Sequence, residues 1–301
     1  MSGPPRLGIG IIGAGRVGAV LGAALRAQGH AIIGACAVSR ASRERAAALL
    51  PGVPLLAVDR IVERSEMVLL AVPDDELGPL AAGIAATGLS PGGQVIVHTS
   101  GSHGIEVLAP LEAAGCTVLA IHPAMTFTGT VADLPRLIGC PMAITARAAL
   151  APIAQALVVE LEGRPVLLAE GDRTAYHAAL SHGANHLVVL VDQAREILSR
   201  LGIEDPGAYL RPLLSAALEE SLAQGARALT GPVRRGDAGT VRAHLEALTD
   251  LAQDGVGSSD LEATYRALAL AALSRAGLDR SREELIRAIL DPAERNPEAG
   301  P

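Results

Sequence analysis

A glycine-rich turn between an apolar run and a helix-forming run constrains this chain more than any other feature. Residues 7–12 are almost wholly apolar, residues 13–18 read GAGRVG, and a segment rich in alanine, leucine and valine follows. This is G-x-G-x-x-G between a predicted strand and a predicted helix, the context that indicates dinucleotide binding. Gly13 permits the tight turn, Gly15 lets a pyrophosphate approach the main chain, and Gly18 lets the helix pack closely on the strand.

The start of the predicted helix adds the electrostatic part of such a site. Its unpaired N–H groups and partial positive charge suit phosphate oxygens. The residues that we expect to bind the cofactor there are Gly13, Ala14, Gly15, Arg16, Val17 and Gly18. The alternative is a glycine turn that only connects a strand to a helix.

The residues after a second predicted strand, at 31–38, bear on the choice between the two nicotinamide cofactors. NAD-selective folds place Asp or Glu about 20 residues past the glycine turn, where it binds the ribose 2′-hydroxyl. Residues 36–43 contain no acid, and Ser39, Arg40 and Arg43 stand there instead. Because guanidinium groups bind phosphate in a bidentate manner, we predict NADP(H), with these side chains on the 2′-phosphate. A solvated loop with incidental arginines is the alternative.

Strand-like and helical segments alternate over the first ~170 residues. Further strands are predicted at 67–72, 94–99, 116–121, 142–145 and 165–169, with a short strand at 55–58. From residue 173 to 290 the pattern is helical. We therefore expect an α/β protein, with an N-terminal Rossmann-type, doubly wound, mostly parallel sheet followed by an all-α C-terminal domain. The predicted domains are residues 1–170, which bind the dinucleotide, and residues 171–301, for substrate binding and dimerisation.

Open parallel sheets bind ligands in loops at the carboxyl ends of their strands. The loop residues that we expect to line the cofactor are Val72, Pro73, Ser100 and Gly101. His122 follows another predicted strand on the same edge, where it would bind a substrate carboxylate or move a proton. A capping or core histidine is the alternative for His122.

The first helix of the predicted helical domain carries polar side chains within an apolar stretch. His177, Ser181 and Asn185 are spaced i, i+4, i+8 and share one face. A polar stripe is costly unless its groups are hydrogen-bonded or used. We predict that this face borders the nicotinamide, with His177 as the candidate acid, and hydrogen bonding to neighbouring helices is the alternative.

The composition of the chain limits the catalytic groups available to it and the partners that it can bind. None of the 25 basic residues is a lysine, so no lysine can act as an acid or a Schiff-base nucleophile. The net charge of −7 without a basic block argues against nucleic acid as a partner. The histidines lack Cys or acidic partners at ligand spacing, so we expect no metal.

Cysteine usage and the chain's start favour a cytoplasmic protein. The three cysteines are unpatterned and indicate free thiols in a reducing compartment. We predict no signal peptide, because no long apolar run follows a basic segment at the N-terminus. The uncharged stretch at 174–191 contains three histidines, which favours a buried helix over a membrane span.

A second motif, TGPVRRGD at residues 230–237, stands between two predicted helices. Gly-Pro and Gly-Asp are typical of turns. We expect an ion pair between Arg235 and Asp237 at this corner. In the alternative, Arg235 binds an acidic substrate.

Together these motifs resemble a known group. GIIGAGRVG with a following Ser-Arg, AVPDDEL, HTSG, IHPAMTF, a YHAA…N helix and GPVRRGD are similar to Rossmann-like bacterial proteins whose C-terminal half is called domain of unknown function 2520. The group is similar in plan to pyrroline-5-carboxylate reductases, ketopantoate reductases and beta-hydroxyacid dehydrogenases. The resemblance implies an N-terminal NADP-binding domain, a helical C-terminal domain, a cleft between them and a homodimer.

One departure from the related enzymes bears on the chemistry. Ketopantoate reductases and beta-hydroxyacid dehydrogenases use a lysine on the first helix of the helical domain, and the ketopantoate pattern resembles K-x-x-x-N-x-x-x-N. Here His177, Ser181 and Asn185 stand at those positions, so His177 takes the acid role or the chemistry differs. We expect an NADPH-dependent reductase of a small, anionic, ketopantoate-like 2-oxo acid. The alternatives are a reductase of cyclic imines and an NADP(H) sensor without turnover.

Overall fold

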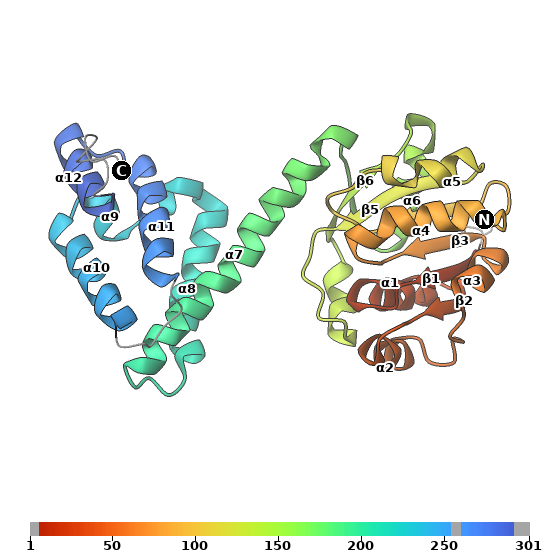
Figure 1. The fold of residues 1–301 in the computed structure, drawn as a ribbon, viewed down its shortest axis with the longest axis horizontal. Helices are drawn as coiled ribbons and strands as arrows, with labels where there is room; N and C mark the ends of the chain where they lie inside the picture. The colour runs from red at the N-terminus through yellow and green to blue at the C-terminus, as the bar shows by residue number, and fades with distance from the viewer. Residues whose placement is uncertain (1–5, 254–259, 292–301) are drawn as a thin grey trace, which may run out of the picture. The chain divides into compact units, whose positions relative to one another are not determined.

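The computed structural model describes residues 6–253 and 260–291, and its contacts divide the chain into two compact units after Gly183. The division falls inside one helix, α7 (Arg173–Arg200). Our sequence prediction places the boundary after residue 170. Each unit is considered by itself below (Figure 1).

The first unit is an α/β domain around one seven-stranded sheet. Its strands are β1 (Gly8–Ile12), β2 (Ala31–Cys36), β3 (Met67–Leu70), β4 (Val95–His98), β5 (Thr117–Pro123), β6 (Pro141–Thr145) and β7 (Arg164–Leu167). Their order is β2-β1-β3-β4-β5-β6-β7, and every pair is parallel except β5 with β6. The predicted Rossmann-type, mostly parallel sheet is therefore confirmed.

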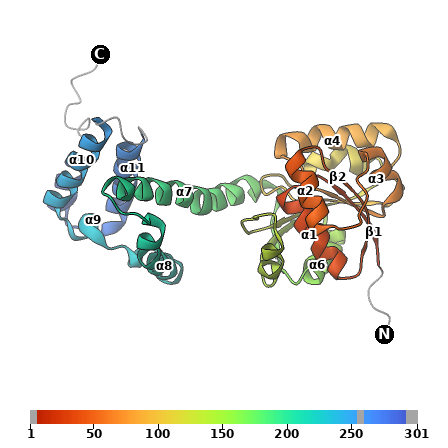
Figure 2. The same ribbon diagram turned by 90° about the horizontal axis from the view of Figure 1, so that it is seen from below.

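Helices cover both faces of this sheet, as Figure 2 shows. One face packs against α1 (Arg16–Ala27), α2 (Arg40–Leu49) and α6 (Ala151–Glu160). The other face packs against α3 (Val58–Arg64), α4 (Asp74–Thr87) and α5 (Ala109–Ala113). Both cores consist mainly of Ile, Leu, Val and Ala, which β-strands buried on both faces require.

The predicted strand at 55–58 is wrong. Leu55 makes a single bridge to Ala35, and Val58 already begins α3. The run VDRIVER buries Ile61 and Val62 on one side only, which is a helical pattern and not a strand pattern. The apolar residues before it were too few to form a ladder.

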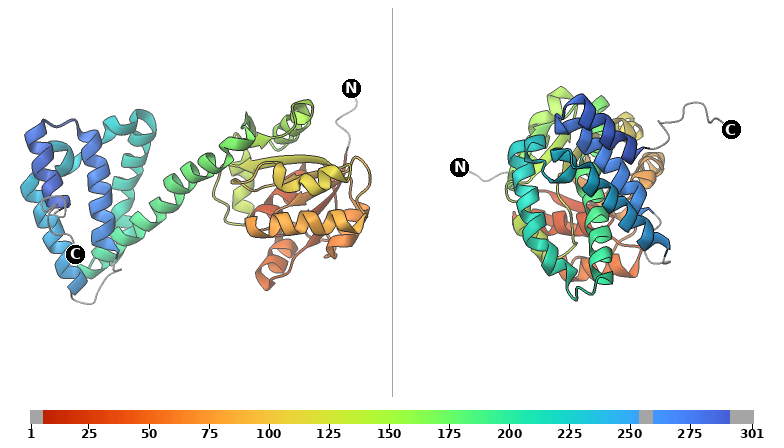
Figure 3. Two further views of the ribbon diagram at one scale, coloured as in Figure 1. Left: turned by 45° about the horizontal axis from the view of Figure 1, so that its top comes forward. Right: turned by 90° about the vertical axis from the view of Figure 1, so that its left-hand side faces the viewer.

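The second unit is helical, which confirms the predicted change of fold class (Figure 3). After α7 its helices are α8 (Pro206–Gln224), α9 (Gly231–Arg235), α10 (Ala238–Gln253), α11 (Leu261–Ala276) and α12 (Arg280–Leu290). Leu245, Leu273 and Ile286 lie in a core between α10, α11 and α12. No helix among the described residues is long and apolar enough to cross a bilayer.

Two sequence predictions for this region are corrected. The stretch at 174–191 is not buried in the single chain, where Val188 is 67% exposed. An apolar composition does not determine whether the side chains of this stretch pack against other residues of the same chain. At the corner after α9, the Asp237 side chain is hydrogen-bonded to Thr240, and Arg235 acts on it through its charge without a contact ion pair. Asp237 caps α10, because its carboxylate accepts bonds from the Thr240 main-chain N–H (3.1 Å) and hydroxyl (2.7 Å).

Candidate active site

The glycine turn has the close contacts that its sequence predicts. Gly13 has a φ of +94°, and a Cβ there would collide with the carbonyl of Ala71. A Cβ on Gly18 would collide with the carbonyl oxygen of Gly13, so the helix approaches the turn closely. A Cβ on Gly15 would meet no atom within 4 Å. The turn is therefore packed tightly at Gly13 and Gly18 and open at Gly15, where a phosphate would approach.

The N-terminus of α1 is a suitable anion site. Its N-cap is Gly15, which makes no side-chain capping bond, and its first turn contains no acid. Ala14 is buried and donates its N–H to the carbonyl of Cys36, which ties the turn to the end of β2. Arg16 and Val17 begin the helix, and Val72 lies against Gly13 after β3. The first-turn N–H groups thus lack a side-chain partner, as phosphate binding requires.

The predicted 2′-phosphate residues lie together at the start of α2, just past β2. Ser39 caps the helix by accepting the N–H of Ser42 at 3.1 Å. Arg40 is exposed and pairs only with Glu44 one turn on, a surface pair of small energy that a phosphate would replace. Arg43 donates to the carbonyl of Ala37 at 3.3 Å.

Sequence reasoning missed a further cation here. Gly129, in the loop after β5, lies against two arginine stems: a Cβ there would be 2.7 Å from Cδ of Arg45 and 3.0 Å from Cγ of Arg16. Arg45 therefore reaches the same loop as Arg16 of the glycine turn. Only the loop's position, which the sequence did not predict, brings these two side chains together.

The loop after β4 is held from inside by His98. Nδ1 of His98 accepts the N–H of Ser100 at 3.2 Å, and Nε2 lies 2.7 Å from the carbonyl of Gly104. These two partners require the neutral tautomer with its proton on Nε2. Burial lowers the pKa of His98 to about 4, which agrees with a neutral ring. His98 is therefore a structural residue.

A chain of polar groups connects the same loop to α4. The N-cap of α4 is Pro73, followed by Asp74. The Ser102 hydroxyl donates to Asp74 at 2.5 Å and lies 2.9 Å from Nδ1 of His103, which also lies 3.2 Å from the Ser100 hydroxyl. The predicted cofactor residue Ser100 therefore lies at one end of a hydrogen-bonded network, and Asp74, which directly follows Pro73, lies at the other.

The predicted site residues Gly101, His122 and His177 meet at the carboxyl edge of the sheet. A Cβ on Gly101 would lie 2.7 Å from Cδ2 of His177 and 3.0 Å from Nε2 of His122. The two rings have centroids 6.4 Å apart at nearly a right angle. Only glycine at position 101 permits this approach.

Tyr176, which sequence reasoning missed, is the hydrogen-bond partner of His122. Its hydroxyl lies 2.9 Å from Nδ1 of His122, and burial raises the pKa of Tyr176, so the phenol keeps its proton. Burial, with the charge of Arg173, lowers the pKa of His122 to about 4. His122 is thus a neutral imidazole, and when Tyr176 donates to Nδ1 the ring N–H is on Nε2, which lies beside Gly101.

Arg173 was also missed, and it underlies this cluster. The first residue of α7, it is 1% exposed, and its guanidinium donates only to neutral oxygens. Its acceptors are Oγ1 of Thr145 (2.8 Å) and the carbonyls of Ser100 (3.2 Å), Ala120 (3.1 Å) and Ala143 (3.2 Å). These bonds join α7 to β5, to β6 and to the loop after β4, and so position Tyr176 and His177.

A cavity of about 240 Å³ joins the glycine turn to this cluster. Its lining includes Arg16 and Val17 from the turn, Thr99 after β4 and His122 at the end of β5. Two predicted cofactor-binding residues, Arg16 and Val17, and one predicted catalytic residue, His122, therefore line one space. The residues present fit a dinucleotide whose phosphates lie at α1 and whose reactive ring lies near His122.

Two predicted residues are placed apart from this cluster. Ser181 is one turn beyond His177 on α7 and partly buried, whereas Asn185 is exposed and lies beyond Gly183, in the second unit. The structure brings neither into a described contact with His122. No group of three His, Cys, Asp or Glu side chains within residues 6–253 and 260–291 is arranged to hold a metal ion.

Comparison with protein families agrees with this geometry. Residues 2–123 match a Rossmann-like domain. Residues 140–272 match the Domain of unknown function DUF2520, so this chain combines a Rossmann-like domain with a DUF2520 domain. The resemblance seen in the motifs is therefore confirmed. No curated protein matches the chain.

Solved structures of similar fold extend over almost the whole chain. Protein BF3122 of Bacteroides fragilis is 21% identical, with a TM-score of 0.75 over 89% of this chain and 98% of that one. An imine reductase from Pseudomonas sp. is 18% identical, with a TM-score of 0.61 over 95% and 100%. A pyrroline carboxylate reductase from Plasmodium falciparum, with NADP bound, is 12% identical, with a TM-score of 0.53 over 96% and 100%. At these identities the likeness is one of fold.

Proposed function

We propose that this protein is an NADPH-dependent oxidoreductase that reduces a small carboxylate-bearing ketone of the 2-oxo acid kind. The observation that carries the proposal is the shared cavity, in which the glycine turn and His122 face one space. Arg16 gives this cavity a cation, which suits an anionic substrate. The cofactor-bound structures of similar fold support the choice of a nicotinamide cofactor.

NADPH would be held by the six residues of the glycine turn, by Val72, Pro73, Ser100 and Gly101, and by Ser39, Arg40 and Arg43 at its 2′-phosphate. When bound, it supplies the hydride. Nε2–H of neutral His122 donates a hydrogen bond to the substrate oxygen, where negative charge develops. His177 beside it delivers the proton, and Ser181 and Asn185 remain predicted catalytic residues.

A second candidate function is reduction of a cyclic imine. It is favoured by the fold shared with a pyrroline carboxylate reductase and with imine reductases. The same His122 and His177 groups would then bind and protonate an imine nitrogen. A panel of 2-oxo acids and cyclic imines separates the two candidates by which class oxidises NADPH.

We also propose that the protein is a homodimer. Helix α8 buries only Pro206 and Leu210. Further along it, Leu213 and Leu222 are 67% and 80% exposed. A helix of this length gains most of its stability from packing an apolar face. We therefore expect the exposed apolar side chains of α8 to pack against a second copy of the chain.

The proposed cofactor site is tested by titrating the protein with NADPH and with NADH, following nicotinamide fluorescence. Arg40→Ala is expected to weaken NADPH binding roughly 10- to 100-fold, since it removes charge-assisted hydrogen bonds to the phosphate. NADH binding should be weak in both proteins. His177→Gln should then lower turnover on the active substrate much more than it changes NADPH affinity.

Arg280→Ala is the matched control. The Arg280–Glu284 pair is 2.8 Å apart and as exposed as the 2.7 Å Arg40–Glu44 pair, but it lies on α12. Equal effects of both variants, or equal affinity for NADH and NADPH in the wild type, would overturn the 2′-phosphate site. NADPH binding without turnover of any ketone or imine would favour the sensor alternative.

A further inference from the structure

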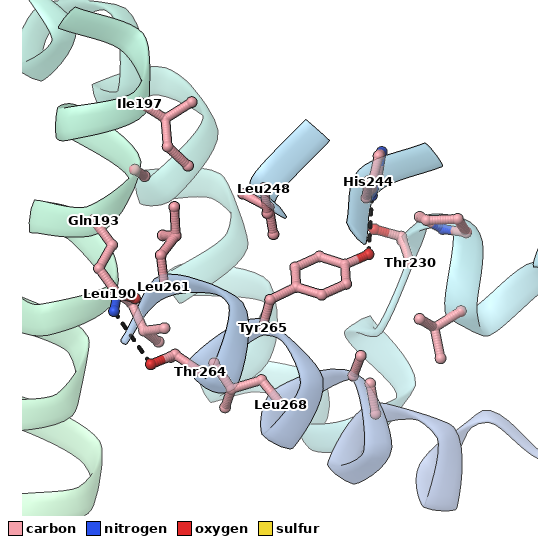
Figure 4. A pocket seen from close by; sticks show the side chains of 15 residues that line it. Leu190, Gln193, Ile197, Thr230, His244, Leu248, Leu261, Thr264, Tyr265 and Leu268 are labelled. Carbon is pink, nitrogen blue, oxygen red and sulfur yellow. Dashed lines mark hydrogen bonds between the residues drawn. The ribbon is translucent and has the colours of Figure 1, made fainter. Parts of the chain in front are cut away.

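The helical unit contains a cavity that the proposed reaction does not use. It has a volume of about 390 Å³ and lies between α7, α9, α10 and α11 (Figure 4). The cavity is open to the surface on one side, where Leu268 of its lining is 42% exposed. A cavity of this size is within the usual range of small-molecule sites.

The lining of this cavity is mostly apolar and carries no formal charge. Leu190 and Ile197 of α7 face Leu248 of α10 and Leu268 of α11. Among the described residues that line it, none is an Arg, Asp or Glu. Burying an ion there would be costly, because no opposite charge lines the wall. The lining therefore favours a neutral ligand with a largely apolar body.

The polar side chains of the wall are Thr230 and two hydrogen-bonded pairs, and Gln193 also donates to Asp260, outside the lining, at 3.1 Å. The Tyr265 hydroxyl lies 2.9 Å from Nδ1 of His244, and the Gln193 amide donates to Thr264 at 3.2 Å. Figure 4 shows the Tyr265 ring directed from α11 toward His244 of α10. Burial raises the pKa of Tyr265, so its phenol keeps its proton. When this proton is donated to His244, the phenol oxygen still has a lone pair for a ligand donor.

We propose that this cavity is a second ligand site, for a neutral and largely apolar small molecule with one N–H or O–H donor. The apolar body fills the space between α7 and α11, and the donor binds the hydroxyl oxygen of Tyr265. This site goes beyond the proposed reductase activity. It differs in chemistry from the first site, which presents Arg16 to an anion.

The test uses two fluorescent probes with the same rings. N-phenyl-1-naphthylamine is neutral and has one N–H, whereas 1-anilinonaphthalene-8-sulfonate adds a negative charge. The full-length wild type is expected to bind the neutral probe saturably, at one site per chain, and the sulfonate at least about 10-fold more weakly. Equal or tighter binding of the sulfonate would overturn the proposal.

Two variants locate the bound probe. Ala272→Leu adds bulk to the cavity wall and should weaken the neutral probe at least about 10-fold, whereas Ala271→Leu, at an exposed position outside the lining, should leave it unchanged. Tyr265→Phe keeps the ring and removes the hydroxyl, so it should weaken binding roughly 3- to 10-fold. Unchanged binding in both Ala272→Leu and Tyr265→Phe would contradict the site.

Two further measurements separate this site from the other proposals. Saturating NADPH should not displace the probe, and Arg40→Ala should bind it as the wild type does, so failure of the cofactor site leaves this result intact. The mass in solution should be equal for wild type and Ala272→Leu. If Ala272→Leu instead changes the mass and the wild type binds no probe, the cavity is a contact between two copies and the ligand site is refuted.

Discussion

His98 and His122 lie near the ends of adjacent strands, yet their rings have different tasks. The nitrogens of His98 are both engaged by main-chain groups of one loop. Nδ1 of His122 is engaged by Tyr176, and its Nε2 lies beside Gly101 and His177. A histidine with both nitrogens occupied holds a loop, whereas one with a directed free N–H can act on a substrate. Sequence alone could not make this distinction for His122, because its partner is 54 residues away.

The low pKa of His98 predicts a pH-dependent stability. In the unfolded chain the ring titrates near 6.5, whereas in the folded protein its pKa is about 4. Between these values the unfolded state binds one more proton, so the free energy of unfolding falls as the pH falls from 6.5 to 4. The slope due to this residue is about 1.4 kcal/mol per pH unit.

His98→Gln should remove that slope. Urea unfolding of both proteins at a series of pH values between 4 and 6.5 measures it, and the variant should show the shallower dependence. The variant will be less stable at neutral pH, but the comparison uses slopes and not absolute values. Parallel curves for variant and wild type would show that His98 is not the titrating group.

At the scale of elements, α7 is fixed to the sheet through its first residue. The buried guanidinium of Arg173 joins β5, β6 and the loop after β4. Arg173→Met should therefore lower the free energy of unfolding by about 2 kcal/mol, because it leaves several buried oxygens without a donor. Urea unfolding measures the change. Arg60→Met on α3, where the side chain is 57% exposed, should change stability by no more than about 0.5 kcal/mol. Equal effects of the two would contradict this role.

Local signals made most elements predictable. All seven strands and the glycine turn follow from short apolar runs and from glycines whose positive φ or close contacts depend on near neighbours. The error at 55–58 arose because a few apolar residues fit both the two-residue repeat of a strand and the 3.6-residue repeat of a helix. Arg173, Tyr176 and Arg45 were missed because their partners lie 28 or more residues away, and nothing in their local sequence distinguishes them from surface residues.

At the scale of the whole molecule, the exposed helix α8 predicts association. Leu213→Asp with Leu222→Asp should convert a species with the mass of two chains into one with the mass of a single chain, measured by light scattering. These charges would be buried in the dimer without partners. Leu55→Asp, which changes a half-exposed side chain of the first unit, should leave the mass unchanged. A wild type with the mass of one chain at all concentrations would refute the dimer.

The hydrogen bonds of Arg173 also set an order of events during folding. Its acceptors lie in β5, in β6 and in the loop after β4, and precede it by 28 to 73 residues. Until those strands are paired, no dry set of oxygens exists to replace the water around the guanidinium. The start of α7 must therefore dock after β4, β5 and β6 have assembled. The cluster of His122, Tyr176 and His177 is completed in that late step, so a chain emerging from the ribosome acquires its candidate catalytic groups only after the sheet is built.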